Sequence, residues 1–188
     1  MKTLKSTKHP KTNPSVGKVR LNLEGRRVGT WQDIVGLLFD NEIRRNIAIA
    51  LLQEVANYQR QGSEFTRSEW PKVILSAMKN DPQLEEYAER MAEKFSELEA
   101  SGIPRSELER ALREYGEQLA EELGIEEKNP WVRYRGAYFI VLRVLERAGM
   151  IMKKRGTYVI SDNFSKKLRI ITKIWEDFAL KTIENTLW

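Results

Sequence analysis

The chain has 188 residues, which suffices for one domain with an insertion or an extension and for a buried core. It has no cysteine and a single histidine, His9, which excludes disulfides, thiolate metal sites and catalytic triads that need a positioned histidine. No apolar run approaches the roughly 18 residues of a membrane span, and the N-terminus lacks the apolar core of a signal peptide. We therefore expect a cytoplasmic protein with no membrane partner.

Charge is unevenly divided along the chain. The formal net charge is +5, yet residues 81–127 hold 15 acidic and 5 basic residues, a net of −10. The remainder carries 27 basic and 12 acidic residues, a net of +15. A basic surface of this kind is typical of a protein that binds a polyanion, most often nucleic acid. The abundance of lysine, arginine and glutamate without cysteine also fits a thermophilic source.

Residues 1–29 are expected to form a basic N-terminal arm. Residues 1–18 are rich in lysine and contain almost nothing to bury, so they are predicted to have no structure of their own. Two interpretations stay open. In one, the arm contacts phosphates or a minor groove, with Lys5, Lys8 and Lys11 as candidates; in the other, it is a solvated tail. Residues 19–23 alternate apolar and polar side chains and favour a short strand or hairpin.

Residues 30–80 are expected to be a helical core. Thr30 is a suitable N-cap for a helix that begins at Trp31, and apolar residues recur at helical spacing as far as Tyr58. A polar break at residues 40–41 divides this stretch into two helices.

A third helix is predicted from Arg67 to Lys79. Thr66 can act as its N-cap, and Glu69 stands at the position that completes a capping box. The residues just before Thr66 leave space for a very short strand.

Residues 81–128 are expected to form an acidic helical hairpin. Apolar residues from Leu84 to Leu98 keep a near-heptad spacing up to a break at residues 101–104, and a second helix follows from Ser106 to Leu123. Most of the glutamates lie on the remaining faces of these helices, as expected of a solvated surface.

Residues 129–161 are expected to form a helix and a hairpin. The helix ends at Gly149, which can adopt the left-handed conformation that stops a helix. Residues 150–152 and 158–160 have the apolar and β-branched character of strands, and residues 153–157 form a basic turn between them. The apolar stripe of the helix consists of Tyr138, Val141, Leu142, Leu145 and Ala148.

Residues 162–188 are predicted to form a long last helix, with Ser161 or Asp162 as its cap. Its apolar residues step by four, three, four and three, and Ile174, Ile183, Leu187 and Trp188 widen the stripe. Such a helix must pack on something, and we expect a second copy; the alternative is that it folds back on its own core. The predicted dimerisation residues are Phe164, Leu168, Ile171, Trp175 and Phe178.

The stretch from Leu145 to Ile151, LERAGMI, carries a family resemblance: a leucine and charged residues lead to a glycine and an aliphatic strand. Together with the basic hairpin that follows, it resembles the second half of a winged helix-turn-helix domain of the archaeal or prokaryotic regulator type. In such domains a recognition helix enters the DNA major groove and the hairpin, or wing, reaches the backbone. The resemblance implies a winged helix-turn-helix domain that is mainly α with a small β-hairpin wing. Charge and apolar spacing add an acidic helical-hairpin insertion and a long C-terminal helix to this expected fold.

Two stretches compete for the role of the second helix of this motif. Residues 117–125, EQLAEELGI, resemble the second helix of many helix-turn-helix regulators. Residues 67–79 are the alternative, in which case the acidic hairpin is an insertion between the second and third helices. We favour residues 117–125 on local resemblance.

The resemblance and the charge together predict which residues contact DNA. Arginines near the recognition helix can bind guanine edges, whereas lysines at the wing reach phosphates. Two features oppose a simple reading head. The arginines can pair with the acidic hairpin instead, and Ile140 and Val144 stand where a recognition helix usually carries polar groups. The candidates are Arg133, Tyr134, Arg135, Arg143, Arg147, Lys153, Lys154, Arg155 and Thr157.

The sequence therefore favours a double-stranded DNA-binding protein, a homodimeric winged helix-turn-helix transcription regulator in the cytoplasm. One alternative is a DNA-coating architectural or virion protein without sequence preference, and another is a winged-helix module that binds proteins. No enzymatic activity, metal site or cofactor is expected, because the carboxylates have the spacing of a solvated helix face and no glycine-rich phosphate loop accompanies them.

Overall fold

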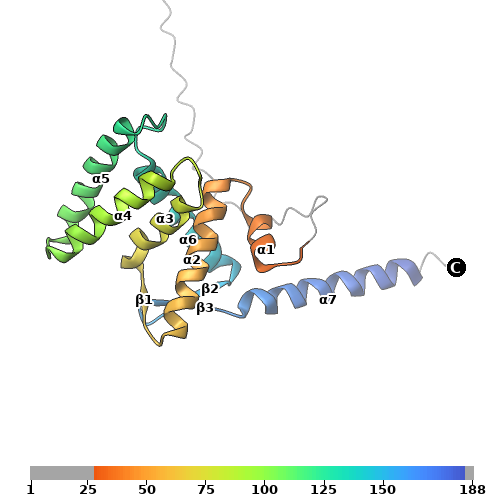
Figure 1. Cartoon of the computed structure of the whole chain (residues 1–188). Coiled ribbons are helices and arrows are strands. Elements are labelled where there is room, and N and C mark those ends of the chain that lie inside the picture. Colours follow the sequence, from red (N-terminus) through yellow and green to blue (C-terminus); the bar gives the residue numbers. More distant parts are fainter. Residues whose placement is uncertain (1–27, 185–188) are drawn as a thin grey trace, which may run out of the picture.

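We describe a computed structural model of the chain, which covers residues 28–184 and the side chains of residues 28–180. It is mainly helical with a small antiparallel sheet, as expected from the sequence (Figure 1). The arm residues Lys5, Lys8 and Lys11 and the predicted strand at 19–23 lie outside the described residues. The elements are α1 (Trp31–Leu38), α2 (Glu42–Arg60), β1 (Phe65–Thr66), η1 (Arg67–Glu69), α3 (Trp70–Lys79), α4 (Glu85–Ala100), α5 (Arg105–Glu122), α6 (Pro130–Ala148), β2 (Ile151–Lys154), β3 (Thr157–Ile160) and α7 (Asn163–Glu184).

The core lies where α2, α3 and α6 meet, and α2 packs against both of the others. Their apolar stripes supply fully buried side chains such as Leu51, Ile74 and Tyr138. Trp70 on α3 and Trp131 on α6 stack with ring centroids 5.2 Å apart, so the two helices share a large aromatic contact.

Two of the predicted helix starts differ in how they are capped. Thr30 and Asp33 form a reciprocal capping box at α1, as the N-cap prediction implied. Thr66 caps η1 by accepting from the Ser68 amide, but the capping box predicted with Glu69 is wrong. The Glu69 carboxylate instead accepts a hydrogen bond from the Tyr58 hydroxyl, because α2 passes close enough to compete for it.

The sheet has the strand order β1-β3-β2, with all pairs antiparallel. The two-residue strand β1 lies between α2 and α3 in sequence and pairs Phe65 with Tyr158 of the hairpin. Phe65 and Thr66 thus form a very short strand at the place where the sequence left space for one.

The favoured assignment of residues 117–125 as the second helix of the motif is not supported by the packing. The helix α3, not α5, packs against both α2 and α6, because its buried residues Val73, Ile74 and Ala77 face them. The chain between α3 and α6 forms the helical hairpin of α4 and α5, which packs on α3 through α4 and on α6 through α5. The hairpin therefore separates α3 from α6 in the sequence, although these two helices pack against each other.

A close approach fixes the hairpin against α6. Gly116 of α5 is buried, and the Tyr87 hydroxyl of α4 donates a hydrogen bond to its carbonyl at 3.2 Å. A Cβ at position 116 would lie 2.5 Å from the Tyr87 hydroxyl and 3.4 Å from the Cβ of Trp131. Only a glycine lets α4, α5 and α6 meet at this distance.

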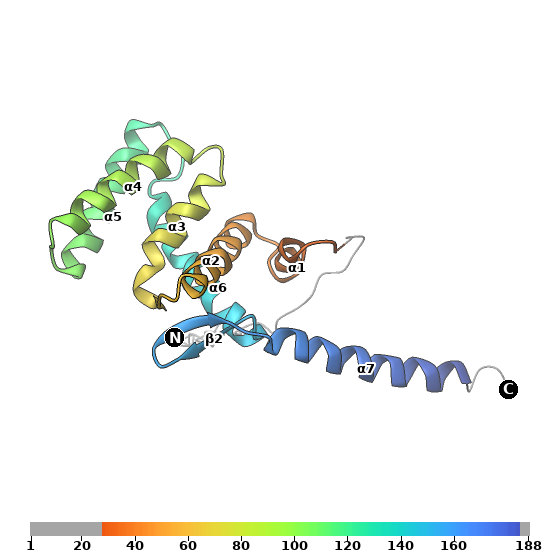
Figure 2. The same ribbon diagram turned by 60° about the horizontal axis from the view of Figure 1, so that its bottom comes forward.

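At its other end, α6 stops at Gly149, which has φ of +85° and is followed by the hairpin, as predicted. The amide of Phe164 donates to the Gly149 carbonyl, so the first turn of α7 is attached to the end of α6. From there α7 extends away from the body, as both ribbon views show (Figures 1 and 2). Ser161 accepts a hydrogen bond from the Asn163 amide at the start of α7.

Candidate nucleic-acid interface

The tip of the β2–β3 hairpin is basic and exposed. Lys153, Lys154 and Arg155 are all exposed, and no salt bridge to them is found among residues 28–184. Arg155 and Gly156 both have positive φ, +51° and +91°, which is the geometry of the tight turns that join twisted strands. Thr157, another predicted DNA contact, donates its hydroxyl to the Lys154 carbonyl at 2.8 Å and closes the turn.

The C-terminal half of α6 and the start of α7 continue this basic surface. Arg143 and Arg147 are exposed on α6, one turn apart. Lys167 of α7 donates to the Arg147 carbonyl at 2.8 Å, which satisfies one of the free carbonyls at the helix end. Lys153, Lys166 and Lys167 line one hollow between the hairpin and α7, together with Glu146. Lys166 also lies 2.9 Å from the Asp162 carboxylate. We call Arg143, Arg147, Lys153, Lys154, Arg155, Lys166 and Lys167 the basic edge.

The N-terminal half of α6 differs, because its arginines are paired with acidic residues. Arg133 lies 2.5 Å from Glu127, and Arg135 lies 2.7 Å from Glu109 of α5. These arginines were predicted to contact DNA, and the structure brings them to carboxylates instead. The alternative in which arginines pair with the acidic hairpin is thus confirmed for these two. The acidic hairpin neutralises the end of α6 that a recognition helix would present to bases.

Tyr134, another predicted DNA contact, is buried, with 1% of its surface exposed, so that prediction is wrong. Tyr134 lies between Trp131 and Tyr138 on the buried face of α6. Its hydroxyl donates to Asp81 at 3.3 Å, and burial together with the nearby Asp81 carboxylate raises the pKa of the Tyr134 phenol. The helical period that placed Tyr138 inward holds for Tyr134 as well, since the two are one turn apart.

The outward face of α6 is apolar between its basic residues. Val132 is 45% exposed and Ile140 is 44% exposed, and between them the space around Gly136 is open. Val144 is partly buried against the core. A recognition helix usually carries polar groups at the positions of Val144 and Ile140. Val144 is therefore covered by the core, and Ile140 is exposed. A flat apolar strip remains in the middle of the helix.

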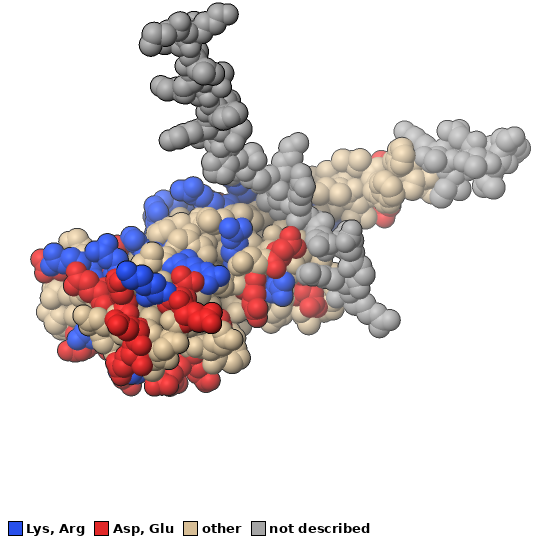
Figure 3. Space-filling model, turned by 90° about the horizontal axis from the view of Figure 1, so that it is seen from above, with Lys and Arg blue, Asp and Glu red and all other residues tan. Residues whose placement is uncertain are grey.

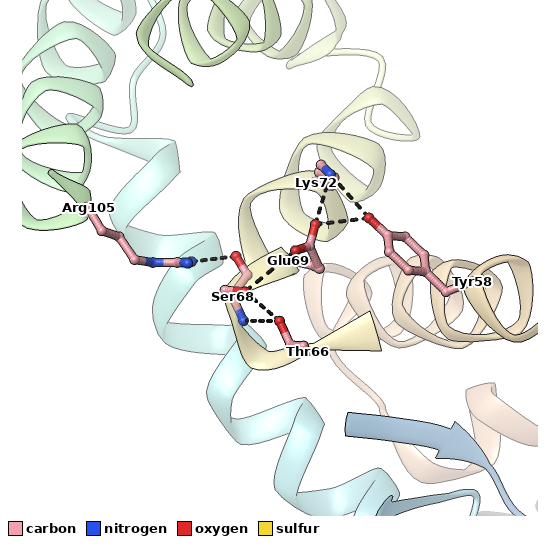
Figure 4. Close-up of polar contacts among 6 residues, drawn as sticks. All are labelled: Tyr58, Thr66, Ser68, Glu69, Lys72 and Arg105. Carbon is pink, nitrogen blue, oxygen red and sulfur yellow. Dashed lines mark hydrogen bonds and ion pairs between the residues drawn. The ribbon is translucent and has the colours of Figure 1, made fainter. Parts of the chain in front are cut away.

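A polar cluster between α2 and α3 was missed by sequence reasoning (Figure 4). Lys72 lies 2.8 Å from Glu69, and the Tyr58 hydroxyl donates to the same carboxylate at 2.9 Å. Burial acts to raise the pKa of Glu69, but hydrogen bonds from Lys72 and Tyr58 outweigh it and lower that pKa. Arg105 of α5 donates to the Ser68 carbonyl, so the cluster also connects the acidic hairpin to η1. The only sequence signal was the three-residue spacing of Glu69 and Lys72.

The predicted dimerisation residues follow a gradient along α7. Phe164 and Leu168 are half-buried, whereas Ile171, Trp175 and Phe178 are 59%, 65% and 59% exposed. The rings of Trp175 and Phe178 contact each other at 5.5 Å. Ile170 and Ile174 are also more than half exposed. In the part of the chain that the structure describes, the outer part of the α7 seam, from Ile171 to Phe178, is therefore largely exposed.

Charged side chains are unevenly distributed over the surface of the folded protein. Acidic side chains are frequent on the hairpin end of the face in Figure 3, while the part of α7 seen there is mostly uncharged.

Among the described residues, no three His, Cys, Asp or Glu side chains are grouped so that they could hold a metal ion. No described helix is long and apolar enough to cross a membrane.

The comparisons with known proteins add no relative: no family model matches the chain, and neither the curated proteins nor the solved structures contain a match.

Proposed function

We propose that this protein binds double-stranded DNA through the basic edge, as a homodimeric protein of the winged helix-turn-helix type. The observation that supports the proposal is the exposed basic tip of the hairpin, with Lys153, Lys154 and Arg155 on a tight turn. Cations held at a fixed spacing and free of carboxylate partners attract phosphates, whose counterions are released on binding.

The order of the elements supports the same proposal. A winged domain has the order helix, strand, helix, helix and hairpin, and its first strand pairs with the hairpin. The elements α2, β1, α3, α6, β2 and β3 follow this order, with β1 paired to β3. Dimerisation through α7 would place two wings on one DNA molecule, as in regulators that bind repeated half-sites.

The site differs from a standard reading head in one respect. Because Arg133 and Arg135 are paired with Glu127 and Glu109, base contacts would come from the middle and the C-terminal half of α6. Ile140 is exposed there and can contact thymine methyl groups, and Arg143 lies three residues further on. Phosphate contacts at the wing and few base contacts predict modest sequence preference.

A salt-titrated shift assay tests the proposal. Replacing Lys153, Lys154 and Arg155 with alanine should weaken binding to every duplex and reduce the slope of log affinity against log salt by about 3. The matched control removes the same number of cations elsewhere, at Lys79, Arg110 and Arg113, and should leave that slope unchanged. An identical slope in the wild type and the wing variant excludes DNA binding through this edge. Genomic and random duplexes, compared in the same assay, distinguish a regulator from a coat.

The second candidate function is a protein-binding winged helix. The strip of Val132, Gly136 and Ile140 favours it, because an apolar face with a glycine at its centre allows close approach of another protein surface. In that case Ile140→Asp abolishes complex formation with a protein partner, and the wing variant leaves it intact.

A further inference from the structure

A second apolar surface lies at the base of α7. A groove of about 400 Å³ runs between α1, α2, the end of β3 and the first turn of α7. Two of its lining residues, Trp31 and Ile160, are 41% and 38% exposed. Apolar side chains dominate the lining, among them Trp31, Ile34, Leu52, Met150, Ile160 and Phe164.

The groove is continuous with the exposed seam of α7, because Phe164 belongs to both. Phe164 is the first residue of the seam and also lines the groove. The seam therefore begins in the groove and runs outward to Phe178. Whatever covers the seam along its length reaches the groove at its inner end.

We propose that the groove receives the C-terminal part of α7 from a second copy of the chain. A twofold axis requires each copy to present the same surface to the other, so two α7 helices that pair along this seam in antiparallel fashion cross near its middle, at Ile171. Each Phe178 then lies close to the base of the other helix, where Phe164 begins the groove. The pairing covers the seam and the groove in one step.

The continuation of α7 beyond Phe178 fits this arrangement. The helix extends six residues further, to Glu184, a rise of about 9 Å at about 1.5 Å per residue. After Phe178 the sequence has the large apolar residues Ile183, Leu187 and Trp188. The groove is lined by α1, α2 and the first turn of α7, so it lies beside the base of the helix, where the partner's α7 would end.

The same chain offers another occupant, its own residues 1–27, and composition argues against it. Residues 1–18 are lysine-rich with almost nothing apolar, and only residues 19–23 alternate apolar side chains. The groove lining has little charge to attract a basic segment, apart from Arg60, which is itself basic.

This inference rests on the proposed α7 dimer but not on DNA binding, and it is tested without DNA. The solution mass of the full chain is measured over a concentration series, together with hydrogen exchange of α1. Phe178→Asp should raise the dissociation constant of the dimer about 1000-fold. Each copy contributes about 30-fold, and the symmetric dimer carries the substitution twice. The substitution should also speed the exchange of α1, since the groove is then uncovered. Trp31→Glu, at an exposed helix start that tolerates an acidic residue, should weaken the dimer about tenfold or more.

Leu180→Asp is the matched control. Leu180 is 59% exposed like Phe178, but it lies about 200° around the helix from it. It should change neither the mass nor the exchange of α1. A monomeric wild type, or a dimer in which Phe178→Asp leaves α1 exchange unchanged, overturns the inference. So does a Trp31→Glu variant that stays fully dimeric while exchange changes in residues 1–27, because the arm then fills the groove. The wing triple variant should remain dimeric, which separates this result from the DNA test.

Discussion

Arg135 of α6 donates a hydrogen bond to Glu109 of α5 at 2.7 Å. The same guanidinium lies over the ring of Trp70, with 5.4 Å from Cζ to the ring centroid. One arginine therefore connects the acidic hairpin to the three-helix body. Through this contact the acidic hairpin places the negative charge of Glu109 beside the N-terminal half of α6.

Replacing Glu109 with glutamine tests this electrostatic effect. Because the pair is partly exposed, its loss should cost less than about 1 kcal/mol of stability. Removal of one negative charge near the proposed DNA surface should raise duplex affinity by roughly two- to threefold at low salt. The control is Glu114→Gln, an exposed position on the same helix that faces about 140° away and forms no salt bridge among the described residues. Equal effects of both substitutions would show that only net charge matters.

The close packing at Gly116 predicts a large effect of a small change. Gly116→Ala brings a methyl group to 2.5 Å from the buried Tyr87 hydroxyl, so the Tyr87 side chain or one of the helices around it must shift. We expect a loss of about 1–3 kcal/mol in urea unfolding, typical of overpacking in a core. A stability equal to that of the wild type would mean that the hairpin is not held against α6 as the structure shows.

For Gly136, a second helical glycine, we expect substitution by alanine to change the stability in the opposite direction. It lies within α6 with open space where its Cβ would be. Gly136→Ala should stabilise the protein by about 0.5–1 kcal/mol in the same urea titration, because alanine has the higher helix propensity. A destabilised variant would indicate that another surface, such as a second copy, already contacts this face in solution.

Much of the fold follows from local patterns in the sequence. The spacing of Tyr138, Val141 and Leu145 sets the inward face of α6, and Gly149 ends the helix with a positive φ, as expected. The basic turn between two short apolar runs becomes the hairpin. These features depend on residues that are close in sequence, so they can be predicted from it.

What could not be predicted depends on contacts between distant residues. The partner of Arg135 is 26 positions away, and that of the Tyr134 hydroxyl is 53 positions away. Which of α3 and α5 packs against α2 depends on contacts between distant residues, and local resemblance does not contain that information. The Glu69 carboxylate likewise went to Tyr58 of α2 rather than to a backbone cap.

Buried tyrosines predict how stability changes at high pH. Burial raises the pKa of Tyr87, Tyr134 and Tyr138 above the value of about 10 that they have in the unfolded chain. Their contribution to stability is complete below pH 10 and is lost as the pH rises through the folded-state pKa values. Tyrosinate absorbance, followed with helical circular dichroism, should therefore show these tyrosines ionising together with unfolding. Ionisation of all six tyrosines near pH 10 with the helices intact would contradict their burial.

The last prediction concerns Arg143 and Arg147, the two exposed arginines of α6. If both contact phosphates, replacing them with alanine reduces the salt slope by about 2 and weakens all duplexes alike. If Arg143 reads a guanine, the variant instead loses about 1–3 kcal/mol on the preferred site and little on random DNA. The control variant, Arg110→Ala with Arg113→Ala, removes two cations from α5. It should change neither the salt slope nor the affinity for the preferred site. Unchanged binding in the α6 variant, beside a strong loss in the wing variant, would restrict the interface to the hairpin and leave α6 free to contact a protein.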